Sequence, residues 1–322
     1  MRAIRVATSG GPEVLEFVDA EEPDPQPHEV LVEVAACGVN FIDTYQRSGL
    51  YQMTLPFTPG SEGAGRVLRA GSAVTGFAEG DRVAWAGVAG SYAEHVAVPA
   101  ASAVKVPETV DDRTAAAAML QGMTAHYLVA STYPIRSGDT ALVHAAAGGM
   151  GLLLTQLITA RGGTVIGTTS TAEKEELARG AGAAEVVRYT EADIAEQVRE
   201  RTGGRGVDVV YDGVGRTTFE ASLASLRPRG TLALFGAASG PVPPVDPQRL
   251  NSAGSLFLTR PTLGHHLLTR EELEWRSGEI FEAVAAGELE VRIGGSYPLG
   301  EARRAHEDLE ARRTTGKLLL VP

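Results

Sequence analysis

The sequence predicts an α/β protein in which an all-β domain is followed by a doubly wound parallel sheet, and three observations support this. The 322 residues exceed the roughly 250 to 300 at which one hydrophobic core usually stops growing. Residues 1 to about 120 carry short apolar runs between Gly, Pro, Asp and Ser clusters, which is typical of strands. After residue 121, apolar strand, glycine turn and helix alternate, as in a βαβ series.

Composition and charge disfavour several classes of binding partner. Hydrophobic residues make up 43% and charged residues 21%, which is ordinary for a folded globular protein. The 29 Lys and Arg against 40 Asp and Glu give a net charge of −11, which disfavours nucleic acid or an acidic membrane as a partner. The lone Cys37 cannot form an internal disulfide, and no apolar run reaches the length of a membrane span. We therefore expect a cytoplasmic protein with no nucleic-acid and no membrane partner.

The first part is expected to form a small antiparallel barrel or sandwich. The polar, proline-rich segment EEPDPQPHE is a surface connection between two of its strands. The strand candidates read AIRVA, LEFVDA, EVLVEVAA, GAGRVLRAG, DRVAWAG and SYAEHVAV.

Six strand candidates define the second part, with helical stretches such as TAEKEELARGAG and EADIAEQVRERTGG between them. The acidic starts and the basic or glycine ends of these stretches agree with the helix dipole and with glycine capping. This series predicts a doubly wound sheet. The strands are expected at 140–146, 163–169, 184–189, 207–214, 230–236 and 255–261.

The segment after about residue 262 does not continue this series. It contains a helical stretch, a shorter helix and a final apolar strand. We expect these elements to return to the first domain, which makes that domain discontinuous. The predicted domains are residues 1–121 with 262–322, and residues 122–261.

The most informative stretch is ALVHAAAGGMGLLLTQL, in which a buried strand leads into a glycine-rich turn and an apolar helix. It is a variant of the dinucleotide-binding G-x-G-x-x-G pattern, with Ala145 at the first glycine position. Missing Cβ atoms let the backbone approach a pyrophosphate, and the helix N-terminus favours the anion. A turn that only packs the helix on its strand is the alternative. The predicted binding residues are Gly148, Gly149, Met150 and Gly151.

The end of the next strand distinguishes between dinucleotides. An NAD site usually carries Asp or Glu about 20 residues after the glycines, whereas residues 167–171 read Gly-Thr-Thr-Ser-Thr. Ser170, Lys174 and Tyr189 are suited to surround a 2′-phosphate, which a carboxylate would repel. The alternatives are a solvated Lys174 and a Tyr189 that only packs. We predict NADPH as the cofactor.

Segments along the whole chain carry a family resemblance: GGPEVLEF, GVNFIDTYQRSGLY, PFTPGSEGAGRV, AAAGGMG, VVYDGVG, SLFLTRP and TTGKLLLVP. On these motifs the chain resembles the zinc-independent quinone oxidoreductases of the medium-chain dehydrogenase/reductase superfamily. The resemblance implies a GroES-like barrel domain, a Rossmann domain, a cofactor in the cleft between them and usually a homodimer.

The same resemblance implies that the ligands of the zinc-dependent relatives are missing here. Asn40 stands where those relatives carry a cysteine ligand, and Gly60-Ser61-Glu62 replaces their Gly-His-Glu. Zinc needs several thiolate, imidazole or carboxylate ligands together. Cys37 lies away from the ligand position and is expected to be a small buried residue. We predict no metal, and a structural role for Glu62.

Without a metal, the expected reaction is hydride transfer to an electron-poor acceptor such as a quinone. The resemblance implies that Asn40 and Tyr45 face the nicotinamide, with Tyr51 near the substrate opening. Asn40 is expected to hydrogen-bond cofactor hydroxyls or a substrate oxygen, and Tyr45 to donate to an oxygen that gains charge. The alternatives are that Tyr45 and Tyr51 only form an aromatic wall, and that solvent supplies the proton.

Strand ends supply further cofactor contacts, because doubly wound sheets bind ligands beyond the carboxyl ends of their strands. Arg312 and Lys317, near the returning strand, are candidates for closing on the phosphates, with plain surface charge as the alternative. The other candidates are Gln121, Thr124, Val214, Phe235, Gly236, Leu258 and Thr259.

The sequence thus predicts an NADPH-dependent, metal-independent quinone reductase. A reductase of α,β-unsaturated ketones or enoyl thioesters with the same site is one alternative. A non-catalytic structural or RNA-binding relative is another, which the acidic charge disfavours. The strand SLFLTRP is expected at an uncovered sheet edge and predicts a homodimer through two Rossmann sheets, unless the PVPPVDPQ loop protects that edge.

Overall fold

The computed structural model describes residues 1–322, which form two compact units. One unit comprises Met1–Met123 with His266–Pro322, and the other comprises Thr124–His265. The sequence prediction sets these boundaries a few residues earlier, after residues 121 and 261. None of the helices is long and apolar enough to cross a membrane.

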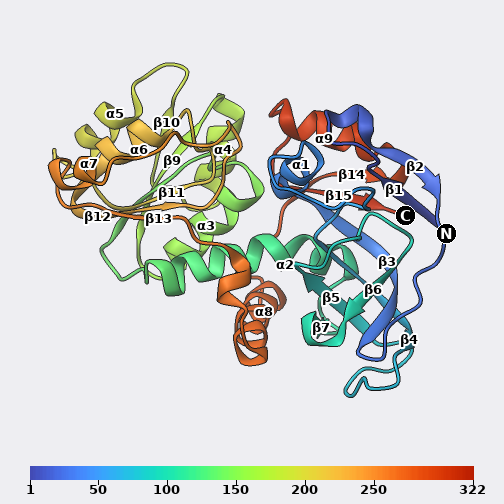
Figure 1. Ribbon diagram of the computed structural model, residues 1–322. Helices are drawn as coiled ribbons and strands as arrows, with labels where there is room; N and C mark the ends of the chain where they lie inside the picture. The colour runs from blue at the N-terminus through green and yellow to red at the C-terminus, as the bar shows by residue number, and fades with distance from the viewer. The chain divides into compact units, whose positions relative to one another are not determined.

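The first unit, called the barrel unit below, joins both ends of the chain. Figure 1 shows N-terminal strands in blue and C-terminal strands in red within it. Its helices are α1 (Phe41–Arg47), α8 (Arg270–Ala285) and α9 (Ala302–Glu310). Its strands are β1 (Arg2–Arg5), β2 (Glu16–Asp19), β3 (Glu29–Val39), β4 (Glu62–Ala70), β5 (Arg82–Ala86), β6 (His95–Pro99), β7 (Ala103–Lys105), β14 (Ile293–Pro298) and β15 (Lys317–Val321).

The main sheet of the barrel unit has the order β14-β15-β3-β4-β5-β7, and β6 also pairs with β3. All pairs are antiparallel except β14 with β15. Val96 and Val98 in β6 are buried between half-buried neighbours, which is the period of two expected for a strand. The last strand lies beside a strand from the start of the chain, because Leu318 of β15 pairs with Val39 of β3.

Three short elements of the barrel unit were not predicted from the sequence. Strand β7 has only three residues, and β14 begins Ile-Gly-Gly, a composition that does not favour strands. Helix α1 is two turns long and follows directly from β3, so its period cannot be separated from that of the preceding apolar run.

The second unit, called the Rossmann unit below, is a parallel sheet with the order β10-β9-β8-β11-β12-β13. Helix α2 (Asp112–Tyr127) carries the boundary into it and continues as a π-helical turn, Leu128–Thr132. The strands are β8 (Thr140–Val143), β9 (Thr164–Thr169), β10 (Glu185–Arg188), β11 (Val207–Asp212), β12 (Leu226–Leu234) and β13 (Phe257–Thr259). The helices are α3 (Gly149–Ala160), α4 (Ala172–Gly180), α5 (Ile194–Arg201), α6 (Phe219–Ser225) and α7 (Pro247–Ser252).

The topology of the Rossmann unit follows from its crossovers. The chain moves outward from β8 through β9 to β10, then returns to the other side of β8 and continues through β11, β12 and β13. Because right-handed crossovers place helices on opposite faces when this direction reverses, α3 packs with α4 and α5 packs with α6. All six predicted strands are present, and the predicted doubly wound sheet is confirmed.

Candidate functional site

The turn between β8 and α3 is shaped for close approach to the backbone. Gly148 caps α3, and Gly149, Met150 and Gly151 form its first residues. A Cβ on Gly151 would lie 2.3 Å from the carbonyl oxygen of Ala145, so only glycine fits there. The first N–H groups of a helix have no partner within the helix and attract an anion.

Counted back from Gly148 and Gly151, the first glycine position of the pattern falls on Ala146 and not on the predicted Ala145. Ala145, one residue earlier, has a left-handed backbone with φ of 51°. This conformation is unfavourable for a residue with a Cβ. Three hydrogen bonds hold it: Ala145 N donates to Thr168 Oγ1 at 3.2 Å, Ala146 N to Thr168 O at 3.0 Å, and Gly148 N to Ala145 O at 2.8 Å. The turn is therefore fixed by its contact with β9.

The end of β9 carries hydroxyls and no carboxylate. Thr168 and Thr169 are buried, and the Thr169 hydroxyl has no hydrogen-bond partner. Ser170 is half-buried, and Lys174 lies in the first turn of α4, where its backbone N–H donates to the Thr171 hydroxyl. Tyr189, 38% exposed, follows the adjacent β10, and its N–H donates to Thr169 O at 3.1 Å. The structure therefore brings the three predicted 2′-phosphate residues to neighbouring strand ends.

A buried carboxylate organises the end of β11. Asp212 accepts hydrogen bonds from the backbone N–H groups of Val214 at 2.8 Å and Gly215 at 2.9 Å, and from the Ser222 hydroxyl at 2.7 Å. The Thr218 hydroxyl donates to the same carboxylate. The loop that presents Val214 is thus held by Asp212, which is not among the residues predicted from the sequence.

The ends of β12 and β13 place the remaining candidates of this unit. Phe235 N donates to Asp212 O at 2.9 Å, and Gly236 fits because a Cβ there would lie 2.4 Å from Gly213 O. Leu258 and Thr259 are half-buried in β13. Thr124, at the start of the Rossmann unit, is buried in α2.

The barrel unit contains a buried ion pair that corrects one prediction. Lys317, only 1% exposed, forms an ion pair with the fully buried Glu62. Its Nζ also donates to Asn40 Oδ1 at 2.7 Å. A Cβ on Gly38 would lie 2.2 Å from Glu62 Oε1, so glycine makes room for the pair. Lys317 is neither a surface charge nor a group that can close on phosphates, because its ammonium is committed inside the barrel unit.

The ion pair fixes the orientation of the Asn40 amide. Lys317 can only donate and an ionised Glu62 can only accept, so Oδ1 faces Lys317 and Nδ2 faces Glu62, 2.6 Å from Oε1. Gln121 Nε2 donates to the same Oδ1 at 3.1 Å. Both lone pairs of Oδ1 are then used, so Asn40 cannot accept a hydrogen bond from a cofactor hydroxyl in this arrangement, and its predicted contact with a ligand would have to be made by the amide nitrogen.

The orientation of Asn40 also fixes that of Gln121 and leaves one Gln121 oxygen without a hydrogen-bond partner. Because its Nε2 faces Asn40, its Oε1 points elsewhere, and that oxygen is buried without a hydrogen-bond partner. A buried acceptor without a partner is unfavourable until a donor reaches it. Glu62, by contrast, is fully used, since its Oε2 accepts from Leu120 N at 2.7 Å. Glu62 therefore has the structural role expected of it.

A second buried polar chain lies behind Asn40. Asp43 accepts from Asn40 N at 2.8 Å, from the Tyr92 hydroxyl at 2.9 Å and from Ser61 Oγ at 3.2 Å. Burial raises the pKa of Asp43 to about 6, although the Asn40 and Tyr92 hydrogen bonds act in the opposite direction. Tyr92 is in turn 3.1 Å from His306 Nε2.

Arg47 forms the last contact in this series of buried hydrogen bonds. Its Nη1 lies 3.0 Å from His306 Nδ1, and its Nη2 pairs with Glu310 at 2.9 Å. Because a guanidinium only donates, Nδ1 of His306 accepts and Nε2 carries the proton. Burial and the nearby Arg47 lower the pKa of His306 to about 3. His306 is therefore a neutral connector between a buried cation and Asp43.

The tyrosine candidates lie on and after α1. Tyr45 is 8% exposed and Tyr51 is 40% exposed, and their rings meet edge to face with centroids 5.4 Å apart. Tyr51 N donates to Tyr45 O at 3.0 Å. This geometry supports the aromatic wall and leaves an acid role for either hydroxyl as a prediction. Arg312 is exposed just after α9.

No group of three or more His, Cys, Asp or Glu side chains in residues 1–322 is arranged to hold a metal ion. Cys37 is fully buried, its Sγ lies 3.8 Å from Leu320 O, and burial raises the pKa of its thiol. It is the small buried residue that the sequence predicts.

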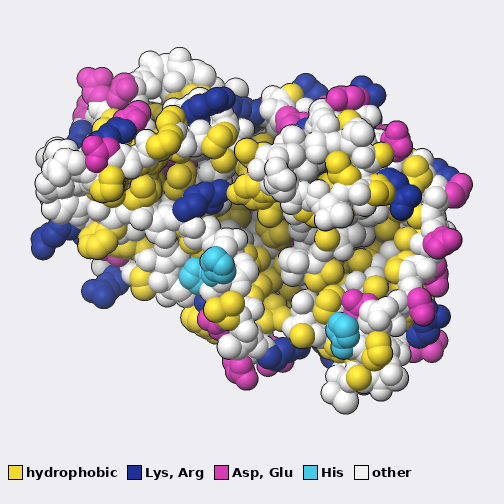
Figure 2. All heavy atoms as spheres, in the orientation of Figure 1, with side chains coloured by type: hydrophobic (Ala, Val, Ile, Leu, Met, Phe, Trp, Pro, Cys, Tyr) yellow, Lys and Arg dark blue, Asp and Glu magenta, His cyan; other side chains and the backbone are white.

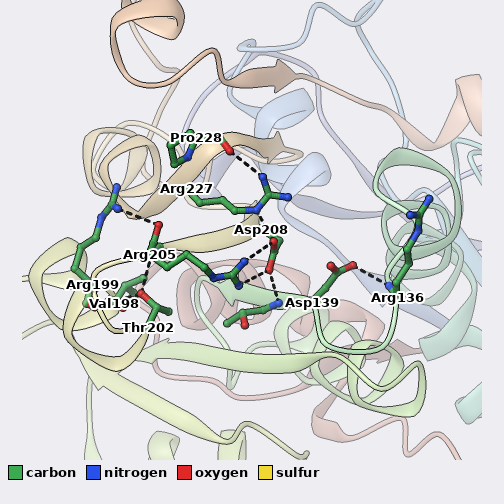
Figure 3. Close-up of polar contacts among 11 residues, drawn as sticks. Arg136, Asp139, Val198, Arg199, Thr202, Arg205, Asp208, Arg227 and Pro228 are labelled. Carbon is green, nitrogen blue, oxygen red and sulfur yellow. Dashed lines mark hydrogen bonds and ion pairs between the residues drawn. The ribbon is translucent and has the colours of Figure 1, made fainter.

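The opposite, amino end of the Rossmann sheet carries a different charge cluster (Figure 3). The guanidinium groups of Arg205 and Arg227 lie on either side of Asp208, at 2.8 and 2.5 Å. Thr140 N donates to the same carboxylate at 2.8 Å. Partial burial opposes ionisation, but these three donors lower the pKa of Asp208 to about 2. The cluster joins the starts of β8, β11 and β12 and is structural.

Sequence reasoning missed the buried polar residues that support the candidates. A faint signal existed for Asp43 and Arg47, which are the two charged residues of the run FIDTYQR and lie four residues apart. His144 interrupts the apolar run ALVHAAA. The partners of these residues lie far away in the sequence, so neither signal identified a contact. Figure 2 shows Lys and Arg side chains scattered among acidic ones on the visible face, without one continuous basic stripe.

Comparisons with known proteins agree with this architecture. The family model for zinc-binding dehydrogenase matches residues 149–277, and that for the alcohol dehydrogenase GroES-like domain matches residues 26–108. A quinone oxidoreductase of Pseudomonas aeruginosa is 47% identical over 100% of this chain and 99% of that protein. A 2-haloacrylate reductase of a Burkholderia species is 42% identical over 97% of this chain and 96% of that protein.

Solved structures give the same result. A mycobacterial protein complexed with NADPH is 55% identical over the full length of both chains, with a TM-score of 0.97. An Escherichia coli quinone oxidoreductase complexed with NADPH is 44% identical over the full length of both chains, with a TM-score of 0.98.

Proposed function

The chain belongs to the quinone oxidoreductases of the medium-chain dehydrogenase/reductase superfamily, and from this membership we propose that it reduces quinones with NADPH. One observation carries the choice of cofactor. The strand end that would hold an Asp or Glu in an NAD site carries Ser170 here, with Lys174 in the first turn of the following helix. An ammonium and hydroxyls attract a 2′-phosphate, which NADPH has and NADH lacks.

The residues of the Rossmann unit fit such a dinucleotide. The space beside Gly151 is closed to any Cβ, and the buried Thr169 hydroxyl has no partner within the protein. Gly149 and Met150 would hold the pyrophosphate through their backbone N–H groups, while the Gly148 N–H is used within the turn and Gly148 would contribute by its missing Cβ. When bound, NADPH supplies a hydride from its dihydronicotinamide ring. The chain's own task is to orient that ring and to exclude water around it.

In the barrel unit, the proposed substrate contacts are Asn40, Tyr45 and Tyr51. Lys317 and Gln121 occupy the Asn40 oxygen, and one amide hydrogen goes to Glu62 Oε1 at 2.6 Å. The other amide hydrogen has only the long contact to Gly38 O at 3.5 Å, and it is the one proposed to turn to a substrate carbonyl oxygen. Tyr51 is the more exposed of the two tyrosines and is proposed to line the substrate opening. The proton for the reduced oxygen comes from Tyr45 or from solvent.

The test compares NADPH and NADH oxidation with a small benzoquinone. We expect kcat/KM for NADPH to exceed that for NADH by about a hundredfold or more, because two charge-assisted hydrogen bonds contribute about 1.5 to 3 kcal/mol each. Lys174→Ala should remove at least tenfold of this preference. The matched control is Lys105→Ala, since Lys105 is an exposed lysine of the barrel unit paired with Asp81. Equal rates for both cofactors in the wild-type protein would reject the cofactor assignment.

A second substrate class is favoured by one relative, the 2-haloacrylate reductase, which is named for an α,β-unsaturated acid. The same site would then deliver hydride to the β-carbon of an enone or enoyl thioester. Product analysis with cyclohexenone, a short enoyl thioester and 2-chloroacrylate separates the two proposals. A saturated product formed faster than hydroquinone would favour the second class.

The homodimer and the cytoplasmic location remain proposals. Strand β13 ends the sheet, and Phe257 in it is 62% exposed, so the edge is suited to pair with a second copy of the chain. Phe257→Asp should convert the dimer to a monomer in light scattering at micromolar concentration. A wild-type monomer under these conditions would reject the pairing. Cell fractionation checks the location.

A further inference from the structure

Two adjacent strand ends, those of β8 and β11, meet where the strand order of the Rossmann unit reverses. Dinucleotides bind at such reversal points in doubly wound sheets. The glycine turn follows β8, and the Val214 loop follows β11. One buried side chain, His144, lies between the two segments and takes no part in the proposed chemistry.

An unbroken path of hydrogen bonds runs through His144. Its Nδ1 is 3.1 Å from Thr168 Oγ1, which also accepts from Ala145 N at 3.2 Å. Its Nε2 is 2.9 Å from Ser222 Oγ, which donates to Asp212 at 2.7 Å.

The chemistry of the partners sets the direction of the path. Ser222 has a single hydrogen, which goes to the Asp212 carboxylate, so its oxygen must accept from His144 Nε2. Thr168 Oγ1 accepts from Ala145 N, so its hydrogen is available for His144 Nδ1. His144 is then a neutral imidazole with the proton on Nε2, and burial lowers its pKa in agreement with this.

Each end of the path holds backbone that a dinucleotide would touch. At one end is the left-handed Ala145, which needs external support. At the other end, Asp212 fixes the N–H groups of Val214 and Gly215. If the path is cut, each segment can relax independently, and a ligand that contacts both must order them on binding.

We propose that His144 is a positioning residue that joins the pyrophosphate turn to the Val214 loop, so that a dinucleotide meets both as one preformed surface. This inference rests on the proposed NADPH site. It assigns to His144, Thr168 and Ser222 a role in binding the pyrophosphate and the nicotinamide half, and none in binding the 2′-phosphate.

The experiment compares two ligands, NADPH and adenosine 2′-monophosphate, by calorimetry. Adenosine 2′-monophosphate carries the 2′-phosphate but neither the pyrophosphate nor the nicotinamide. In Ser222→Ala we expect the Kd for NADPH to rise about tenfold and the Kd for adenosine 2′-monophosphate to stay within about twofold, as for the loss of one buried hydrogen bond. His144→Asn, which loses the Nε2 donor, should behave in the same way.

The matched control is Ser225→Ala. Ser225 is a buried serine on the same helix, and its hydroxyl donates only to Ala221 O at 2.7 Å. We expect it to change neither Kd. Nitrogen-15 NMR of the wild-type protein should show His144 neutral with the proton on Nε2.

Three outcomes would overturn the inference: unchanged NADPH affinity in Ser222→Ala, an equal loss for both ligands, or a proton on Nδ1 of His144. If the wild-type protein bound neither ligand, the proposed NADPH-dependent function itself would be rejected. Failure of the proposed role of His144 can therefore be distinguished from failure of the proposed function.

Discussion

His306 in the barrel unit and His144 in the Rossmann unit occupy comparable positions in two different networks. Each is buried, and each passes a hydrogen bond from Nε2 through one hydroxyl to an aspartate, Asp43 or Asp212. The networks differ at Nδ1. His306 faces the Arg47 guanidinium there, whereas His144 faces the Thr168 hydroxyl.

Because of this difference, we expect substitutions in the two networks to have different main effects, one on stability and the other on ligand binding. The barrel network contains buried formal charges, whose partners cannot be removed without leaving an uncompensated charge. The path through His144 has no cation, and its loss leaves only unpaired hydroxyls beside a carboxylate that keeps its other donors. We expect substitutions in the barrel unit to act mainly on the free energy of unfolding, and those in the Rossmann unit mainly on cofactor affinity.

The largest effect is expected from Lys317→Met. It leaves Glu62 as a buried anion without its cation, so the free energy of unfolding should fall by about 3–5 kcal/mol in urea titration. Lys317→Met with Glu62→Gln removes both charges and should recover more than half of that loss. A double variant as unstable as the single one would show that packing, not charge, sets the effect. Lys105→Met, at an exposed ion pair, should change stability by less than about 1 kcal/mol.

The next effect tests His306 directly. His306→Phe leaves Arg47 and Tyr92 without a shared partner and should lower the free energy of unfolding by about 2–4 kcal/mol. The exposed His28 provides the control, since His28→Phe should stay within about 0.5 kcal/mol. His144→Phe should lower the free energy of unfolding less than His306→Phe does, but it should weaken NADPH binding more. The reverse order would contradict the expectation that the barrel network acts on stability and the His144 path on cofactor affinity.

The pH dependence of stability depends on two buried groups of the barrel unit, His306 and Asp43. His306 has a folded pKa of about 3, below its ordinary 6.5, so protons bind preferentially to the unfolded chain and stability is lost as pH falls through this window. Asp43 has a folded pKa of about 6, above its ordinary 3.8, so stability is gained as pH falls from 6 to 3.8. The two contributions oppose each other between about pH 4 and 6.

Asp43→Asn removes only the second contribution. Between pH 6 and pH 4.5, this variant should lose about 1.4 kcal/mol per pH unit more than the wild-type protein, in urea titrations at fixed ionic strength. An unchanged difference between variant and wild type across these pH values would show that Asp43 titrates near its ordinary pKa.

The smallest effect is expected at the amino end of the Rossmann sheet. Asp208→Asn weakens contacts with Arg205 and Arg227, which keep part of their side chains in solvent, so the loss should be about 1–2 kcal/mol after solvent screening. Because the folded pKa of Asp208 is lowered to about 2, its contribution is present above pH 3.8 and lost on further acidification. Thermal melting at pH 7 and pH 3 should show a smaller difference between variant and wild type at the lower pH.

The Rossmann unit could be predicted well from the sequence because its signals are local. Strand, glycine turn and helix follow one another, and the turn around Gly148 and Gly151 works through backbone atoms and the absence of side chains. The absence of an acidic residue at the end of β9 is likewise visible directly in residues 167–171. The fold class and the strand series were therefore confirmed, while the individual contacts to cofactor stay predictions.

The barrel unit resisted prediction because its site depends on distant partners. Lys317 lies 277 positions from Asn40 and 255 from Glu62, and nothing near it in the sequence indicates an ion pair. Its position near the returning strand suggested a group that closes on the cofactor phosphates, and its burial beside Glu62 does not fit that prediction. The contacts of the Asn40 oxygen could not be predicted for the same reason, since the groups that occupy it come from α2 and β15.

The place of β15 beside β3 has a consequence for protein synthesis. On the ribosome, the stretch that becomes β3 emerges early, yet its neighbour is translated only after the whole Rossmann unit. That unit, being continuous in the chain, can mature during translation. The barrel unit begins first in the sequence but can complete its folding only after β15 has been synthesised. Until then, Glu62 has no Lys317 with which to form its ion pair.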